Sequence, residues 1–138
     1  MSMSNKLLKI EDLELSFKMY EGISTVLKKI NLELSKGEKV ALVGESGSGK
    51  SVTTKLILGL LNQKNVSKKG KILFNNRNIL NLSQNEYKKI RGNNIAIIFQ
   101  DPIAALNPVF KIKDQFYEVN LNNKKISRKD SFIKTCEA

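Results

Sequence analysis

Histidine is absent from this 138-residue sequence, and tryptophan is absent as well. Without histidine the chain can hold no His-ligated zinc site and no Ser-His-Asp or Cys-His catalytic arrangement. The single cysteine, Cys136, has no partner for an internal disulfide, which excludes a small scaffold held together by disulfide bonds. Any chemistry must therefore come from lysine, carboxylate, hydroxyl, amide and backbone groups.

Long apolar runs are missing too. The longest, residues 56–61 and 95–99, are much shorter than the roughly 20 residues that a membrane-spanning helix needs. The N-terminal segment, residues 1–6, is polar and lacks the apolar core of a signal peptide. The sequence therefore predicts a soluble, cytoplasmic chain.

Acidic residues are scarce relative to basic ones. The sequence has 24 Lys and Arg against 13 Asp and Glu, a net charge of +11. Such an excess suits polyanionic partners, namely nucleotides, nucleic acid or anionic lipid. Lysine makes up nearly all of it, and arginine, the usual residue for base recognition, occurs only at Arg77, Arg91 and Arg128. Because the lysines are scattered, dedicated nucleic-acid binding is the weaker interpretation, and a compositional bias of the genome is an alternative source of the charge.

Two kinds of strand pattern are present. Residues 13–17 and 30–35 alternate apolar and polar side chains on either side of a turn at Tyr20–Gly22, which predicts half-buried antiparallel strands. Residues 40–43 and 95–99 are continuously apolar, which predicts strands that are buried on both faces.

The remaining elements follow from turn and helix signals. They are a helix from Val52 to about Leu61, a surface loop over 63–70, a short strand over 72–74 with a turn at Asn75–Asn76, a helix opened by the Ser83-x-x-Glu86 capping box, and helices over 112–119 and 128–136. The chain ends at Ala138 inside the last helical pattern without a cap or breaker. We therefore expect a domain that is cut short.

One motif carries clear chemistry. Residues 44–51 read Gly-Glu-Ser-Gly-Ser-Gly-Lys-Ser and fit the phosphate-binding pattern G-x-x-x-x-G-K-[ST]. The glycines permit positive φ and bring backbone N–H groups close to phosphate oxygens, and the N-terminus of the next helix adds partial positive charge. Lys50 is expected to reach the β- and γ-phosphates, and the Ser51 hydroxyl to ligate Mg²⁺. A merely flexible turn would not explain a match that lies between an apolar run and a helix, so the sequence predicts binding of a nucleoside triphosphate.

A second motif follows the second apolar run. Residues 99–108 read Phe-Gln-Asp-Pro-Ile-Ala-Ala-Leu-Asn-Pro. Gln100 comes directly after the predicted strand, where the ligand-binding edge of an α/β sheet lies. Its amide oxygen can ligate Mg²⁺ and orient water, while its NH₂ group can contact phosphate. The alternative is a surface loop residue without such a role.

Together, Gly44–Ser51 and Phe99–Pro108 resemble the Walker A motif and Q-loop of the ATP-binding subunits of ATP-binding cassette (ABC) transporters. The likeness is closest to the oligopeptide, dipeptide and nickel importer group, and it covers essentially the whole chain. It implies the first part of an α/β ABC ATPase domain. That part comprises an N-terminal antiparallel β portion over residues 1–38, a P-loop NTPase core through the Q-loop over 39–110, and the start of a helical subdomain over 111–138.

The resemblance also implies cofactors and site residues. ATP and Mg²⁺ are the implied cofactors, and the nucleotide would be held by Gly44, Glu45, Ser46, Gly47, Ser48, Gly49, Lys50, Ser51, Val52 and Gln100. Ser51 and Gln100 would share the Mg²⁺ ion. The family stacks adenine on an aromatic side chain near the end of the first strand, a place that Phe17 takes by alignment. Tyr20 is the alternative stacking residue, and core packing is the competing role for Phe17.

The implied function is to energise an importer for peptides or nickel from the inner face of the membrane. The implied partners are transmembrane permease subunits, a second ATP-binding subunit in a head-to-tail dimer and, indirectly, a solute-binding protein. The chain carries no LSGGQ-type signature, Walker B pair or switch histidine. No catalytic residue beyond Gln100 is therefore assigned, and turnover by this chain alone is not expected. Two alternatives stay open: a non-transport P-loop protein acting on nucleic acid, and an inactive remnant.

Overall fold

The computed structural model describes residues 6–61, 65–103, 105–123 and 127–136. The chain forms two compact units, Met1–Tyr87 and Lys88–Ala138, whose boundary falls inside a helix. None of the helices within the described residues is long and apolar enough to cross a lipid bilayer.

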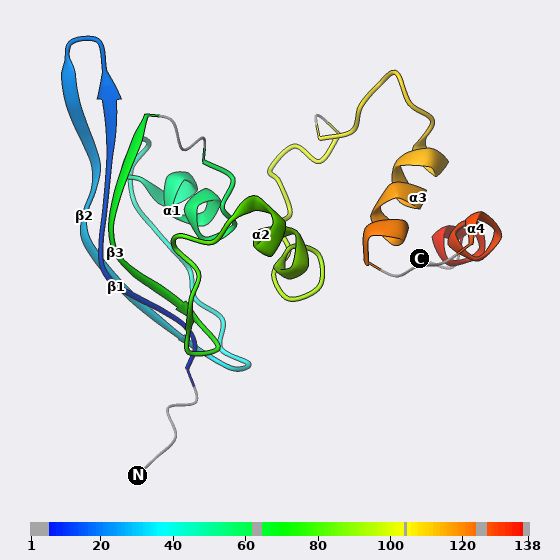
Figure 1. Ribbon diagram of the computed structural model, residues 1–138, viewed down its shortest axis with the longest axis horizontal. Coiled ribbons are helices and arrows are strands. Elements are labelled where there is room, and N and C mark those ends of the chain that lie inside the picture. The colour runs from blue at the N-terminus through cyan, green and yellow to red at the C-terminus, as the bar shows by residue number, and fades with distance from the viewer. Residues whose placement is uncertain (1–5, 62–64, 104, 124–126, 137–138) are drawn as a thin grey trace. The chain divides into compact units, whose positions relative to one another are not determined.

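The first unit is built on a four-stranded antiparallel sheet in the order β2-β1-β3-β4 (Figure 1). Its strands are β1 (Lys6–Met19), β2 (Gly22–Ser35), β3 (Val66–Phe74) and β4 (Arg77–Asn78). β1 and β2 form a long hairpin in which Met19 pairs with Gly22. The two predicted N-terminal strands and the turn between them are confirmed, and both strands extend beyond their alternating segments.

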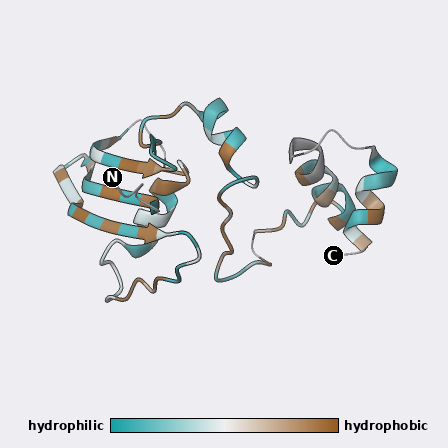
Figure 2. Cartoon of the chain, turned by 90° about the horizontal axis from the view of Figure 1, so that it is seen from below, coloured by the Kyte–Doolittle hydropathy of each residue, from teal (hydrophilic) through white to brown (hydrophobic). Residues whose placement is uncertain are grey.

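One face of this sheet carries the core. Leu13 and Leu15 of β1, Leu27 of β2 and Ile72 of β3 are each at most 1% exposed. The hydropathy colouring of the strands alternates along their length (Figure 2), as the period of two residues in a strand requires. Full burial of a leucine or isoleucine side chain contributes about 1.5–3 kcal/mol. These positions therefore supply much of the stability of the first unit.

Helix α1 (Lys50–Ile57) ends sooner than predicted. Gly59 has a φ of 62°, and the Leu60 amide donates to the Lys55 carbonyl at 2.9 Å, which closes the end of the helix. A Cβ atom on Gly59 would lie 2.6 Å from Tyr87 Cζ. The buried Tyr87 ring therefore occupies the space into which a side chain at this position would point.

Three further predicted helices are confirmed, namely α2 (Gln84–Ile90), α3 (Ile112–Asn123) and α4 (Arg128–Cys136). Helix α2 opens with the predicted capping box. The Ser83 amide donates to the Glu86 carboxylate at 3.0 Å, and the Glu86 amide donates to Ser83 Oγ at 3.3 Å. The bonds from Ser83, and secondarily the charge of Arg77, lower the pKa of the Glu86 carboxyl. The turn at Asn75–Asn76 is confirmed as well, with φ values of 48° and 63°.

Two apolar runs do not form strands, and here the prediction was wrong. Residues 40–43 and 95–99 have no regular strand structure, and Val43 and Ile98 are 90% and 93% exposed. Among the described residues, the only strand-type pairing of Ile95 is an isolated bridge to Arg91, and the sheet contains β1 to β4 alone. A buried strand needs neighbouring strands that pair with its backbone N–H and C=O groups, and layers that cover both faces of the sheet. An apolar run shows that a segment is suited to a buried strand, but the strand forms only where neighbouring segments pair with its backbone.

The predicted surface loop over residues 63–70 was also wrong in part. Residues 63 and 64 lie outside the described residues, but β3 begins at Val66 and pairs with β1 along its polar first half. The predicted short strand over 72–74 is the end of this longer strand. Lys68 tolerates partial burial there because its Nζ donates to the Leu80 carbonyl at 3.1 Å. The loss of hydration lowers the pKa of Lys68.

Candidate nucleotide-binding site

The glycine-rich loop lies between β2 and α1 in the first unit. Gly47 and Gly49 have φ values of 84° and 92°, in the left-handed region that favours glycine. The Ser48 amide donates to the Glu45 carbonyl at 3.3 Å and closes a turn within the loop. Gly49 is the N-cap residue of α1. The loop therefore adopts the backbone that its glycine spacing predicts.

The ammonium group of Lys50 is hydrogen-bonded to the loop itself. Its Nζ donates to the Gly44 carbonyl at 2.6 Å, to the Glu45 carbonyl at 2.6 Å and to Ser48 Oγ at 3.2 Å. A lysine ammonium has three protons, so these three acceptors match its whole donor capacity. The positive charge is thus fixed within the segment that is expected to receive phosphate.

Gly49 lies close to Leu27 of the core and is hydrogen-bonded to helix α1. A Cβ atom at this position would lie 2.6 Å from Leu27 Cδ2 and 3.5 Å from the Val26 carbonyl oxygen. On the other side, Thr53 donates to the Gly49 carbonyl through both its amide, at 2.8 Å, and its Oγ1, at 2.9 Å. Sequence reasoning missed this buried threonine. The sequence signal that could have revealed it is a threonine four residues after the helix N-cap, where the threonine hydroxyl can donate to the carbonyl of the N-cap residue.

A hollow of 430 Å³ lies over the start of α1. It is lined by Ser46, Gly47, Gly49, Lys50, Ser51 and Val52. The first amides of a helix have no partner within the helix and carry partial positive charge, and the first turn of α1 contains no acidic residue. Free amides, an ammonium group and positive potential around one hollow are the properties of a phosphate-binding site.

The donor set also suits a magnesium–nucleotide complex. Ser51 is exposed in the first turn of α1, where its hydroxyl oxygen is the kind of hard ligand that Mg²⁺ prefers. Among the described residues there is no cluster of three or more His, Cys, Asp or Glu side chains that could hold a metal ion.

Gln100 belongs to the second unit. It is exposed at a bend, and the Asp101 carboxylate beside it accepts a hydrogen bond from the Ile103 amide at 3.1 Å. Because residues 95–99 do not form the predicted strand, Gln100 does not sit at a sheet edge within the described residues. A Mg²⁺ ion shared with Ser51 stays a prediction.

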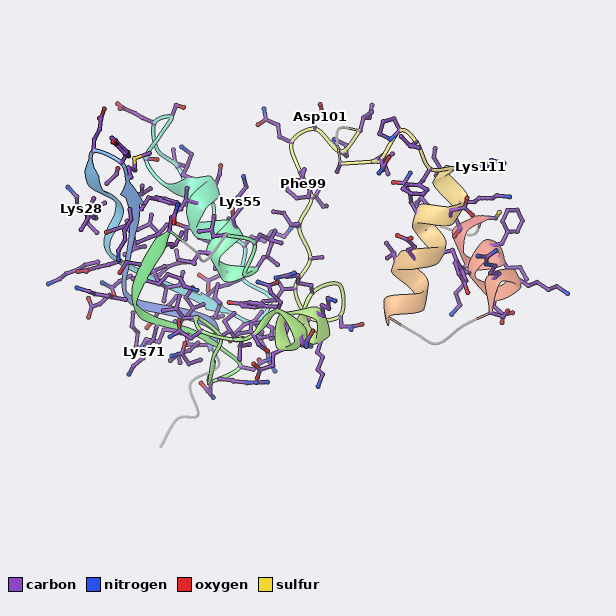
Figure 3. All side chains as sticks on the ribbon, turned by 45° about the horizontal axis from the view of Figure 1, so that its top comes forward. Lys28, Lys55, Lys71, Phe99, Asp101 and Lys111 are labelled. Carbon is purple, nitrogen blue, oxygen red and sulfur yellow. The ribbon has the colours of Figure 1, made fainter. Side chains whose placement is uncertain are left out.

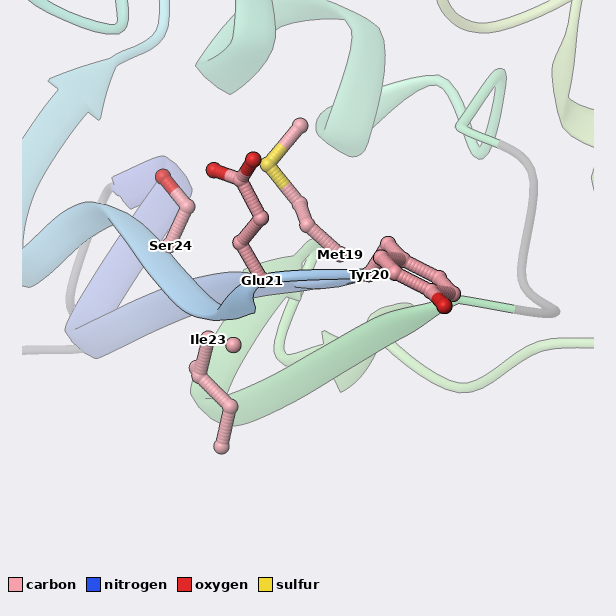
Figure 4. Close-up of a pocket in the computed structure, with 6 residues that line it drawn as sticks. Met19, Tyr20, Glu21, Ile23 and Ser24 are labelled. Carbon is pink, nitrogen blue, oxygen red and sulfur yellow. The ribbon is translucent and has the colours of Figure 1, made fainter.

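The two candidate stacking residues lie near the tip of the β1–β2 hairpin. Phe17 pairs with Ser24 and is half-buried, whereas Tyr20 is fully exposed in the turn. A second hollow of 430 Å³ adjoins Tyr20, and Met19, Glu21 and Ser24 rise on one side of the hairpin around it (Figure 4). Both aromatic rings have an exposed portion, so both stay candidates for stacking a base.

A family model for ABC transporters matches residues 27–137, which is most of the chain. The chain belongs to the ABC transporter family. The resemblance that was based on the two motifs is therefore confirmed.

Curated relatives in this family are named for peptide transport. The chain is 43% identical to the dipeptide transport ATP-binding protein DppD of Lactococcus lactis subsp. cremoris, over 96% of this chain and 38% of that protein. It is 44% identical to the oligopeptide transport ATP-binding protein OppD of Bacillus subtilis, over 89% of this chain and 35% of that protein. It is 40% identical to OppD of Escherichia coli, over 94% and 38%. The chain thus spans less than two fifths of the length of each of these relatives.

Solved ABC structures share the fold. The dimeric structure of MJ0796, a bacterial ABC transporter cassette, has a TM-score of 0.79 and 26% identity over 94% of this chain and 54% of that chain. A post-hydrolysis state of the same cassette, bound to ADP and Pi, has a TM-score of 0.70 and 25% identity over 91% and 54%. The predicted fold class, part of an ABC ATPase domain with an antiparallel β portion, is confirmed.

Proposed function

We propose that this chain is the ATP-binding part of an ABC importer, with peptides as the transported solute. The observation that carries the proposal is the Lys50 ammonium held inside a loop with two left-handed glycines at the start of α1. Relatives named for dipeptide and oligopeptide transport support peptides over nickel as the solute. Nickel stays the alternative, because no residue described above contacts a solute.

In this proposal the backbone amides of Gly44–Val52 surround the triphosphate of ATP, and Lys50 contacts its β- and γ-phosphates. Binding exchanges three neutral acceptors of Lys50 for anionic phosphate oxygens, which also attract the ammonium as a charge of opposite sign. Ser51 and Gln100 ligate Mg²⁺, which when bound neutralises phosphate charge. Phe17 or Tyr20 stacks on the adenine.

The test is Lys50→Ala, with Lys55→Ala as the control. Lys55 is an exposed lysine of the same helix, so its removal changes the net charge equally. Each lost charged hydrogen bond is worth about 1.5–3 kcal/mol, so two phosphate contacts correspond to a loss of affinity of roughly 100-fold or more. Titration of a fluorescent ATP analogue measures both variants. Unchanged affinity in Lys50→Ala would contradict the proposed site.

We further propose that the 138-residue chain binds nucleotide without turning it over. It contains no histidine to act as the family's switch residue, and its sequence matches neither the LSGGQ-type signature nor the Walker B pair. A malachite-green assay on the same samples measures phosphate release. Release that depends on Lys50 would show that the chain hydrolyses ATP by itself.

The proposed partners are transmembrane permease subunits and a second ATP-binding subunit in a head-to-tail dimer, with a solute-binding protein acting indirectly. The chain would then lie on the cytoplasmic face of the cell membrane. Coupling to the permease runs through residues 101–110 and the helices after them, and in the loop Leu106 and Phe110 are 42% and 59% exposed. Exposed apolar side chains of this kind are available to pack against a membrane partner.

Leu106→Ala and Phe110→Ala are therefore expected to reduce solute uptake while ATP affinity stays unchanged. Peptide uptake in a complemented strain and nucleotide titration measure the two properties separately. Leu60→Ala in the first unit, which removes an apolar side chain of similar exposure, is the control. Normal uptake in both loop variants would count against this coupling route.

Nucleic-acid binding is the second candidate, and only the net charge of +11 favours it. Lys28, Lys55 and Lys71 project from β2, α1 and β3 (Figure 3), so the lysines do not form a single stripe. A mobility shift with DNA or RNA that persists at about 0.15 M salt would favour this function, because scattered phosphate contacts weaken steeply as salt rises.

A further inference from the structure

Gln115, in the first turn of α3, makes an unusual set of contacts. Its Oε1 accepts a hydrogen bond from the Asn107 amide at 2.9 Å, and its Nε2 donates to the Asn107 carbonyl at 3.0 Å and the Phe110 carbonyl at 3.1 Å. A side-chain amide has two N–H donors and one carbonyl acceptor. Both donors and the acceptor of Gln115 are therefore used on one short stretch of backbone.

The turn that receives these bonds is closed on itself as well. Asn107 Oδ1 accepts from the Val109 amide at 3.0 Å, and the Phe110 amide donates to the Asn107 carbonyl at 3.3 Å. Pro108 restricts the backbone between them. The turn Asn107–Phe110 is thus a compact unit, and Gln115 is its bonded link to helix α3.

This turn has little apolar burial of its own. Val109 and Phe110 are 84% and 59% exposed, so packing does not hold the turn in place. A side-chain amide that bonds both the N–H and the carbonyl of one residue fixes orientation as well as distance, because its two partners lie in defined directions. A displacement of the turn is therefore passed to the first turn of α3.

We infer that Gln115 is a positioning residue that fastens the Asn107–Phe110 turn to helix α3, so that the two move as one body. The inference rests on the proposed function, because the turn is part of the segment after Gln100 that couples nucleotide to the membrane partner. It assigns a role to a glutamine outside both sequence motifs.

The first test is hydrogen exchange of the Asn107 amide in the full 138-residue chain. Gln115→Met keeps the length of the side chain and removes every hydrogen bond, so we expect the Asn107 amide to exchange about fivefold faster or more. Glu118→Gln, a single-charge change at an exposed position of the same helix, is the control and leaves the rate unchanged. An exchange rate within about twofold of wild type in Gln115→Met would mean that Gln115 only fills space, which overturns the inference.

The second test is the pH profile of Gln115→Glu. An ionised carboxylate cannot donate to the Asn107 and Phe110 carbonyls, whereas a protonated carboxyl can donate to one of them. After correction for intrinsic exchange, the rate of the Phe110 amide, which donates to the Asn107 carbonyl within the turn, should in this variant fall toward the wild-type value as the pH drops through about 4.3. The Asn107 amide keeps a carboxyl oxygen as its acceptor in both ionisation states. Gln115→Met should show no such recovery. Parallel profiles for the two variants would contradict a hydrogen-bonding role.

The functional test measures peptide uptake by cells that carry the complete transporter, together with nucleotide affinity. Gln115→Met is expected to lower uptake about fivefold or more, in line with its exchange effect, at unchanged nucleotide affinity. Fast exchange of Asn107 combined with normal uptake would overturn the positioning role. If the wild-type chain neither binds nucleotide nor supports uptake, the proposed function fails, and the exchange experiments still decide whether Gln115 fastens the turn.

Discussion

The close fit around Gly49 allows a quantitative prediction for Gly49→Ala. The residue has a φ of 92°, and an L side chain in a left-handed conformation costs about 1–2 kcal/mol. The new Cβ would also lie 2.6 Å from Leu27 Cδ2, and overpacking of this kind costs about 1–3 kcal/mol. Leu27 is only 1% exposed, so its side chain has little room to move. We therefore expect a total destabilisation of about 2–5 kcal/mol.

Gly47→Ala is the matched control. Its φ of 84° carries the same backbone cost, but a Cβ there would meet no atom within 4 Å. The expected loss is therefore only about 1–2 kcal/mol. Urea unfolding followed by circular dichroism gives the free energy of unfolding for both variants. Equal destabilisation by the two substitutions would refute the claim that position 49 requires glycine because a Cβ atom there would clash with Leu27.

A double-mutant cycle sharpens this test. Leu27→Val removes the branch that a Cβ on Gly49 would meet, and alone it should cost about 0.5–1.5 kcal/mol, as comparable deletions of one methylene do. In the Gly49→Ala background the same change should cost less or become favourable, because it relieves the clash. We expect a coupling energy of about 1 kcal/mol or more. Additive effects would show that the two residues do not compete for space.

Two further predictions concern helix ends. Gly59→Ala should destabilise the first unit by about 2–5 kcal/mol, because its φ of 62° and the close Tyr87 ring, with Cζ 2.6 Å from the new Cβ, repeat the situation at Gly49. A urea midpoint equal to wild type would contradict this. Folding lowers the pKa of the Glu86 carboxyl, so its contribution to stability is present above the unfolded pKa of about 4.3 and is lost as the pH falls through the lower folded value. Glu86→Gln should therefore be less stable than wild type at pH 7, and the difference should shrink as the pH falls below about 4.3. A difference in the free energy of unfolding that does not change with pH would contradict this.

Local signals in the sequence were sufficient for several elements. The capping box at Ser83 and Glu86 satisfies helix amides within one turn, so its prediction needs no distant partner. The alternating residues of β1 and the glycine spacing of residues 44–51 likewise specify a backbone through short-range sterics. Family membership followed from the two motifs at residues 44–51 and 99–108, because motifs of defined spacing are more specific than composition or charge.

Other features depended on residues far apart in the sequence. The apolar runs at 40–43 and 95–99 were predicted as buried strands and are not, because an apolar pattern does not supply the neighbouring strands that hold a segment in a sheet. The polar first half of β3 is a strand for the opposite reason, since pairing with β1 outweighs its composition. Tertiary contacts override local preference wherever backbone hydrogen bonds must come from another segment.

Glycine spacing alone specifies the backbone of the loop that precedes α1, because it acts through local geometry. Folding of the whole chain, in contrast, places Leu27 beside Gly49, Tyr87 at the end of α1 and the Gln115 side chain in hydrogen-bond contact with the backbone of Asn107. The residues in each of these contacts are not related by any repeating pattern in the sequence. Their geometry exists only once the chain has folded and brought the two segments within contact distance.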